Sequence, residues 1–191
     1  MTAKQLKLAP QKSEVVLLAA GRKLKSNTIE LKETNIRSQE SVKYLGIHMD
    51  QNMKMGAHVR KIAEKAGKTI SNTSRIMPNI GGPREGSRRM ICSVAQSIMR
   101  NDMEKSHGKK VYRNVLLSVQ RRAAIKIACA YKTTSTKALL MIARTPLIDL
   151  LAEERTMVQN NVSKGLARLQ IMEKWQQFWE IDDGKANWTK R

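Results

Sequence analysis

Basic side chains at helical spacing are the residues of this chain whose types and positions best suit chemistry. Five of them share one side of the segment 57–77: Arg60, Lys61, Lys65, Lys68 and Arg75. The other side is an apolar stripe from Val59 to Met77, as expected for a helix with one buried face. Glu64 is the only acid of the segment. A merely solvated face mixes charge signs, so nearly uniform positive charge favours the phosphates of a nucleic acid as ligands.

Two later segments carry further candidate phosphate-binding residues. The helix expected from Pro83 to about Met99 begins with three arginines: Arg84, Arg88 and Arg89. Cations at a helix N-terminus oppose the helix dipole, so this placement indicates an anion nearby. The helix expected over 111–130 has a basic side of its own: Arg113, Arg121, Arg122 and Lys126. Together with the first segment, these helices predict an extended surface for nucleic acid.

The charge of the whole chain supports the same interpretation. Its 191 residues have a formal net charge of +20, from 36 basic and 16 acidic side chains. Residues 51–100 carry +8 and residues 101–150 carry +7, whereas residues 151–191 carry +1. Such an excess repels itself in a compact fold, and RNA, DNA or an RNA–DNA hybrid would offset it. A solubilising basic surface without a ligand is the alternative.

Other chemistries find little support in the sequence. Cys92 and Cys129 lie far apart in apolar helical patterns, which is typical of buried thiols in a reducing compartment. His48, His58 and His107 have no Cys/His spacing around them, so we expect no metal site. There is no signal-peptide pattern, and no apolar run approaches the ~20 residues that span a bilayer. We expect an intracellular protein of the nucleus or cytoplasm, with neither a membrane nor a small molecule as partner.

The elements that position the basic residues change in type after residue 50. Val15–Ala19 predicts a strand buried on both faces, or a short helix, and Thr28–Leu31 predicts a second strand. Ile36 belongs to a third extended piece, and Val42–Ile47 predicts a strand with a glycine inside it. Because buried strands are seldom isolated, these pieces predict one small antiparallel sheet. The predicted fold class is therefore α+β, mostly α, with the sheet followed by a helical array.

Breaks in the apolar pattern predict how the helices after the basic segments begin and end. Residues 101–108 predict a polar loop. Ser135 or Thr134 is suited to cap the short helix that follows directly. Thr145-Pro146 predicts the N-cap and the first turn of one long final helix.

Several sequence motifs occur in a fixed order along the chain. They are Leu8-Ala9-Pro10-Gln11-Lys12-Ser13-Glu14, Val42-Lys43-Tyr44-Leu45-Gly46, Arg75-Ile76-Met77-Pro78-Asn79-Ile80-Gly81-Gly82-Pro83, Ser93-Val94-Ala95-Gln96-Ser97-Ile98, Val119-Gln120-Arg121-Arg122 and Cys129-Ala130-Tyr131-Lys132-Thr133-Thr134-Ser135. Over nearly the whole chain, this ordered set resembles the reverse transcriptase of non-long-terminal-repeat retrotransposons, especially the arthropod kind that targets ribosomal DNA. The resemblance implies an RNA-directed DNA polymerase, with Mg²⁺ as the cofactor of the full-length enzyme.

The resemblance also implies roles for particular residues. Lys12 would lie near the phosphates of the incoming nucleotide. Tyr44, Leu45 and Gly46 look like the primer grip, a hairpin that holds the primer end against the active site. The basic helices that follow look like the thumb, which grips the template–primer duplex. The implied segments are the end of the palm, the thumb, a helical C-terminal region and a Trp-containing tail: 1–55, 56–107, 108–173 and 174–191.

The chain departs from the family at positions that carry catalysis. Arg100-Asn101-Asp102-Met103 stands where the family has a Tyr-Gly-Ala…Trp segment, and the family's zinc knuckle has no counterpart. The palm motif with two metal-binding aspartates is also missing, since no strand pattern flanks Asp182-Asp183. We therefore expect this chain to contain no catalytic residue. It would be a polymerase fragment that binds template–primer but is inactive alone, with the missing polymerase part as a partner. The alternative is an independent basic nucleic-acid-binding protein, and a self-sufficient enzyme is disfavoured.

Overall fold

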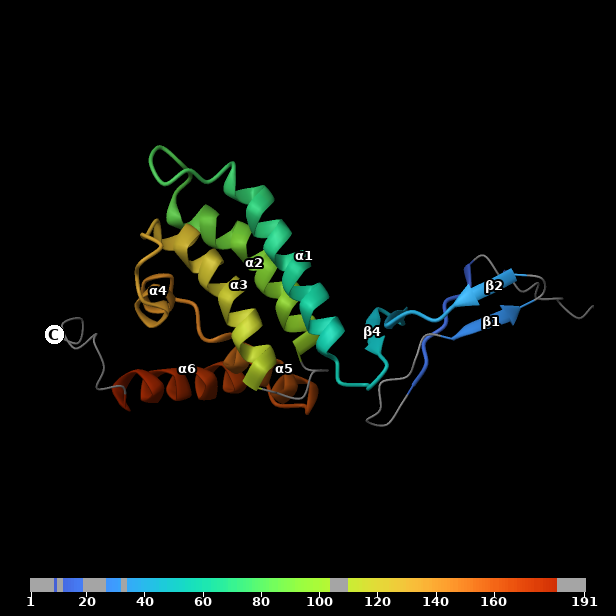
Figure 1. Cartoon of the computed structure of the whole chain (residues 1–191). Helices are drawn as coiled ribbons and strands as arrows, with labels where there is room; N and C mark the ends of the chain where they lie inside the picture. The colour runs from blue at the N-terminus through green and yellow to red at the C-terminus, as the bar shows by residue number, and fades with distance from the viewer. Residues whose placement is uncertain (1–8, 10–11, 19–26, 32–33, 104–109, 182–191) are drawn as a thin grey trace, which may run out of the picture. The chain divides into compact units, whose positions relative to one another are not determined.

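The chain forms two compact units in a computed structural model, residues 1–58 and residues 59–191 (Figure 1). The structure describes residues 9, 12–18, 27–31, 34–103 and 110–181. Four short strands precede six helices in this described part, so the predicted fold class, α+β and mostly α, is confirmed. The boundary between the units lies close to the expected division after residue 55, and the two later divisions fall inside the second unit.

The described strands of the first unit form two antiparallel ribbons of two strands each. β1 (Thr28–Leu31) pairs with β2 (Thr34–Arg37). β3 (Ser41–Tyr44) pairs with β4 (Ile47–Asp50). The threonine, isoleucine, valine and tyrosine residues of these strands favour extended backbone. The strand predicted over 28–31 and the extended piece around Ile36 are confirmed, whereas the single small sheet is wrong because the ribbons are separate.

The segment predicted as one strand, Val42–Ile47, is instead the hairpin formed by β3 and β4. Leu45 and Gly46 make its two-residue turn, with φ angles of 46° and 85°. Positive φ at both central positions is the feature of a type I′ turn, which reverses the chain and matches the twist of the paired strands. Reading Gly46 as a bend inside a strand therefore misses the reversal.

The buried strand predicted over Val15–Ala19 is also wrong. Within the described part of this segment, Val16 forms an isolated parallel bridge with Gln39, and Leu18 is exposed. Residue 19 lies outside the described residues. Because the described strands form two-stranded ribbons, they offer no central position in which both faces of a strand would be covered.

The second unit is a helical array, and its first helix begins at the end of the first unit. The helices are α1 (Gly56–Ser74), α2 (Glu85–Met103), α3 (Lys110–Ala128), α4 (Thr136–Ile142), α5 (Ile148–Gln159) and α6 (Lys164–Ile181). α3 packs against α2, α4 and α5, and α6 packs against α5. The helix α2 continues through residues 101–103, where a loop was predicted, and residues 104–108 of that loop lie outside the described residues. Among the described helices, none combines the length and the apolar character needed to cross a bilayer.

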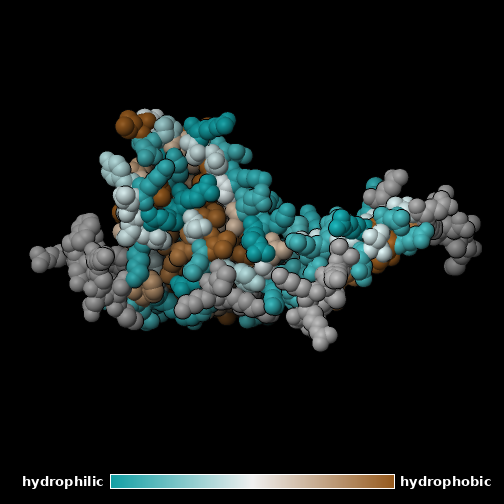
Figure 2. All heavy atoms as spheres, viewed as in Figure 1, coloured by the Kyte–Doolittle hydropathy of each residue, from teal (hydrophilic) through white to brown (hydrophobic). Residues whose placement is uncertain are grey.

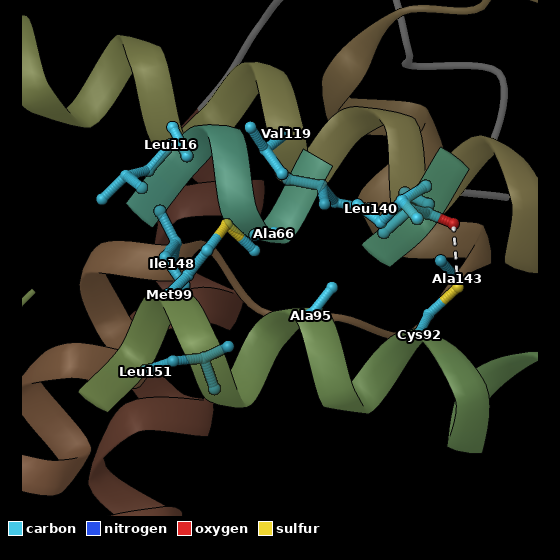
Figure 3. Packing of buried hydrophobic residues seen from close by; sticks show 14 of the residues in the cluster. Ala66, Cys92, Ala95, Met99, Leu116, Val119, Leu140, Ala143, Ile148 and Leu151 are labelled. Atoms are coloured by element: carbon cyan, nitrogen blue, oxygen red, sulfur yellow. Dashed lines mark hydrogen bonds between the residues drawn. The ribbon is translucent and has the colours of Figure 1, made fainter. Parts of the chain in front are cut away.

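Small and aliphatic side chains from five helices form the core of the helical unit (Figure 3). Buried members from successive helices are Ala66, Ala95, Met99, Leu116, Val119, Leu140, Ala143, Ile148 and Leu151. The alanines let helix backbones approach closely, and methionine fills irregular space. The core is thus mainly aliphatic, and Val94 of α2 lies outside it, exposed to solvent.

The long final helix predicted after Thr145-Pro146 is broken into α5 and α6. Asn161, just past the end of α5, has a φ of 65°, a left-handed conformation that asparagine tolerates better than most residues. Ser163 then accepts the Leu166 N–H at 3.4 Å and so caps the start of α6. The cap predicted for α4 is confirmed, since the Ser135 hydroxyl accepts the Ala138 N–H at 3.3 Å.

The N-terminus of α5 is stabilised by a side chain from α3. Its N-cap residue, Leu147, has no side-chain cap, and the predicted N-cap, Thr145, instead donates its hydroxyl to a nearby carbonyl. The buried amide of Gln120 accepts the Ile148 N–H at 3.0 Å and donates to the Pro146 carbonyl at 2.7 Å. The side-chain amide of Gln120 therefore takes the place of a local N-cap. The sequence of α5 itself does not indicate this contact.

The two cysteines are expected to react with thiol reagents at very different rates. Burial raises the pKa of the Cys92 thiol to about 11, and its Sγ donates to the Ala123 carbonyl at 3.8 Å, whereas Cys129 is exposed. The raised pKa lowers the thiolate fraction of Cys92 on the order of 100-fold relative to an ordinary thiol, and the core also blocks access to it, so Cys92 should be alkylated much more slowly than the exposed Cys129. Mass spectrometry after timed alkylation at pH 8 measures both rates, and equal rates would contradict the burial of Cys92.

The raised pKa of Cys92 also predicts that the free energy of unfolding falls at alkaline pH. The neutral Cys92 thiol is favoured in the folded state, so its contribution is complete below pH 9.0, the ordinary thiol value. That contribution is lost as the pH rises toward about 11. Replacing Cys92 by alanine should remove this alkaline loss, which urea unfolding at several pH values would show.

Candidate nucleic-acid interface

The exposed side of α1 carries the five cations that its sequence places there. Arg60, Lys61, Lys65, Lys68 and Arg75 are all exposed, while the apolar stripe opposite them is buried in the core. Helical spacing puts the first four on one side of α1, and Arg75 directly follows the end of the helix. The arrangement therefore offers positive charge from Arg60 to Lys68 and again at Arg75, beside a helix that is about 28 Å long for 19 residues.

One acid interrupts this positive side. Glu64 pairs with Lys68 at 2.7 Å, one turn along the helix, and both side chains are exposed. The hydrogen bond and the charge of Lys68 lower the pKa of the Glu64 carboxyl. An exposed pair of this kind contributes little free energy because water screens it. Lys68 can therefore exchange this carboxylate for a phosphate oxygen at small cost.

A shallow groove joins α1 to α3 and adds more cations. It has a volume of ≈ 160 Å³ and is lined by Ile70, Ser71, Ser74, Arg122, Ile125, Lys126 and Lys132. None of these described lining residues is acidic. Lys, Arg and Ser side chains next to two isoleucines suit a phosphate oxygen together with the sugar next to it. We call these seven residues the α1–α3 groove.

Two contacts explain why the groove collects positive charge. Gly67 leaves room for Arg122, because a Cβ built on that glycine would lie 3.1 Å from Nη1 of the arginine. Arg121 donates to the Lys132 carbonyl at 2.5 Å and to Thr136 Oγ1 at 2.9 Å, which fixes the turn after α3. Arg121 therefore positions the turn that carries Lys132. Sequence reasoning missed Lys132, since only this tertiary contact brings it beside α1.

Arg88 does not belong to the interface, and its prediction as a nucleic-acid-binding residue is wrong. It is 3% exposed and its guanidinium is engaged with carbonyls. It donates to Pro83 O at 2.7 Å, to Lys126 O at 3.2 Å, to Met77 O at 3.4 Å and to Pro78 O. The anion expected near the start of α2 is thus replaced, for this arginine, by carbonyl oxygens of the loop between α1 and α2 and of the last turn of α3.

The other predicted cations of α2 and α3 differ in whether a carboxylate pairs with them. Arg89 pairs with Glu85, and Arg113 pairs with Asp149. These neighbouring carboxylates compete with a phosphate for the same guanidinium groups. Arg84, by contrast, is exposed at the start of α2. Of the predicted cations, those of α1 together with Arg84 and Arg122 are therefore accessible to a polyanion, and the α1–α3 groove adds Lys132.

The hairpin of the first unit presents its turn to solvent. Tyr44 is 61% exposed and Leu45 is 83% exposed. The positive φ of Leu45 costs about 1–2 kcal/mol relative to the right-handed conformation. A strained backbone conformation at an exposed turn is often part of a functional site. A Cβ on Gly46 would meet nothing within 4 Å, so its role lies in its φ of 85°. Lys12, the predicted nucleotide-proximal residue, is exposed in the same unit.

Comparisons with protein-family models, with curated proteins and with solved structures found no match to this chain. The resemblance to a reverse transcriptase therefore stays a prediction that depends on the ordered sequence motifs. Likewise, none of the described residues form a group of three or more side chains that could hold a metal ion. The charges and the geometry of the helical unit are the independent basis for a functional proposal.

Proposed function

We propose that this chain binds the phosphate backbone of a template–primer duplex, as the primer-grip and thumb part of a retrotransposon reverse transcriptase. The single observation that supports this most is the exposed, nearly uniform positive side of α1. Phosphates follow one another every ~3.4 Å along each strand of a duplex, so a helix of about 28 Å faces several of them at once. The α1–α3 groove adds a second row of cations beside α1.

The composition of these helices favours binding without sequence preference. Residues 56–128 contain one tyrosine, Tyr112, and neither tryptophan nor phenylalanine, so stacking on successive bases has little to use there. Lysine and arginine contacts with phosphates fix the position of a duplex but do not read its bases. We therefore expect an RNA–DNA hybrid of any sequence to be bound, with an affinity that falls steeply with salt.

The proposal is tested by two triple variants that remove equal charge. One replaces Lys61, Lys65 and Lys68 by glutamine, and the matched control replaces three exposed lysines of α4 and α6: Lys137, Lys164 and Lys174. A general field effect would weaken binding equally in both. A local grip lowers the slope of log affinity against log salt by about 1 for each phosphate that a lysine no longer neutralises, hence by up to about 3 in the α1 variant alone.

The measurement is a salt titration of a fluorescently labelled RNA–DNA hybrid, followed by anisotropy. Equal losses in the two variants would contradict a grip by α1 and leave an unspecific basic protein. Hydrogen exchange adds a test of the primer-grip assignment, since a bound hybrid should protect backbone amides around Tyr44. Binding without that protection would favour an independent nucleic-acid-binding protein over a reverse-transcriptase thumb.

A further inference from the structure

The loop between α1 and α2, residues 75–84, presents apolar side chains to solvent. Ile80 is 93% exposed and Ile76 is 61% exposed, although the apolar stripe of α1 predicted Ile76 to face inward. Figure 2 shows the hydrophobic atoms at the tip of this loop against a largely hydrophilic surrounding. An isoleucine that remains almost fully in water gains nothing from burial in the fold, so it is available to enter another molecule.

The loop is held in place by the protein beneath it. Met77 is fully buried, and the Arg88 guanidinium binds the carbonyls of Met77, Pro78 and Pro83. Gly82 packs so closely on the Pro78 carbonyl and on Arg88 that a Cβ there would collide with both. The buried arginine therefore fixes both ends of the loop, and Ile80 is presented from a preorganised support.

Positive charge flanks the exposed isoleucines. Arg75 and Arg84, at the two ends of the loop, are both exposed. The ten residues from one to the other include no acid, and the next acid, Glu85, is paired with Arg89. An apolar tip between two cations complements a nucleic-acid duplex, in which phosphates lie on either side of the stacked bases.

We propose that this loop is a wedge, which inserts Ile80 between two base pairs from the minor-groove side of the duplex while Arg75 and Arg84 contact phosphates. Aliphatic side chains inserted in this way partly unstack a base step. An RNA–DNA hybrid with A-like geometry suits such a loop, since its minor groove is wide and shallow. The wedge rests on the proposed function, because it needs a duplex bound on the helical unit.

The test uses the full chain and an RNA–DNA hybrid with 2-aminopurine, whose fluorescence rises when it is unstacked, in the DNA strand. The wild-type chain should raise this fluorescence on binding. Replacing Ile80 by serine should abolish the rise and weaken binding about tenfold, the loss expected for one buried aliphatic side chain. The control is Leu169→Ser, at an exposed aliphatic residue of α6, which should change neither quantity.

The salt dependence separates the wedge from the phosphate grip. Ile80→Ser should leave the salt slope unchanged, whereas Arg75→Gln should lower it by about 1. Wild-type binding without a rise in fluorescence overturns the wedge and leaves the proposed function standing. No binding of the hybrid at all overturns the proposed function, and the wedge with it. A change in self-association by sedimentation in Ile80→Ser, with the fluorescence rise intact, would assign the loop to a protein contact and also overturn the wedge.

Discussion

Replacing Arg88 by methionine is expected to lower the free energy of unfolding by about 3–5 kcal/mol, although the two side chains have similar volumes. The arginine donates to four carbonyls, three from the loop between α1 and α2 (Met77, Pro78 and Pro83) and one from the last turn of α3 (Lys126). Methionine has no donor, so these carbonyls, one buried and three partly buried, would lose their partner. Urea unfolding followed by far-ultraviolet circular dichroism gives the free energy.

Arg89 provides the matched control for this experiment. It is the next residue of α2 and it pairs with Glu85 at the surface, so Arg89→Met should change the free energy of unfolding by less than about 1 kcal/mol. Arg88→Lys should fall between the two, because a single ammonium cannot reach carbonyls in several directions. Equal effects of the methionine variants would mean that the buried guanidinium does not tie the helices together.

Arg88 also shows what the sequence does not predict about a charged residue, namely its partner in the fold. The pattern of three arginines at the start of α2 predicted a single anionic partner, but the structure gives each a different environment: Arg84 is exposed, Arg88 is buried and Arg89 is paired. Periodicity identifies the side of a helix on which a cation lies. It does not identify the carbonyl or carboxylate that another element brings to it, which is also why Lys132 was missed.

The strands and helices were predictable to different extents for physical reasons. The segment 57–77 carries a long apolar stripe, so α1 was predicted together with its buried side, except for the exposed Ile76. The helix expected over 111–130 is α3. The residue pattern alone predicted one strand over 42–47, because Leu45 adopts a positive φ that leucine rarely takes and Leu-Gly is not a usual turn-forming pair. The hairpin at Tyr44-Leu45-Gly46 that the resemblance implies is present as β3 and β4. At the break between α5 and α6, the sequence does carry a signal: Asn161 can end a helix and Ser163 can begin one.

The chain alone is expected to extend no primer, which is the largest effect on activity that we predict. Phosphoryl transfer by a polymerase uses two metal ions, which carboxylates must hold close together. Five described acids of the helical unit are instead paired with cations at separate places: Glu64 with Lys68, Glu85 with Arg89, Asp149 with Arg113, Glu153 with Lys174 and Glu154 with Arg168. Residues 182 and 183, the adjacent aspartates, lie outside the described residues.

A primer-extension assay with Mg²⁺ and a primed RNA template measures this directly, with a retroviral reverse transcriptase as the positive control. We expect binding of the template–primer without incorporation above the protein-free background. Asp182→Asn/Asp183→Asn serves as the decisive variant if any incorporation is seen. Incorporation that stays with the chain through purification and disappears in this variant would place the catalytic carboxylates within the chain. The proposal would then change from a nucleic-acid grip to a polymerase that acts alone, because carboxylates that hold Mg²⁺ beside a bound primer end are what the chemistry requires.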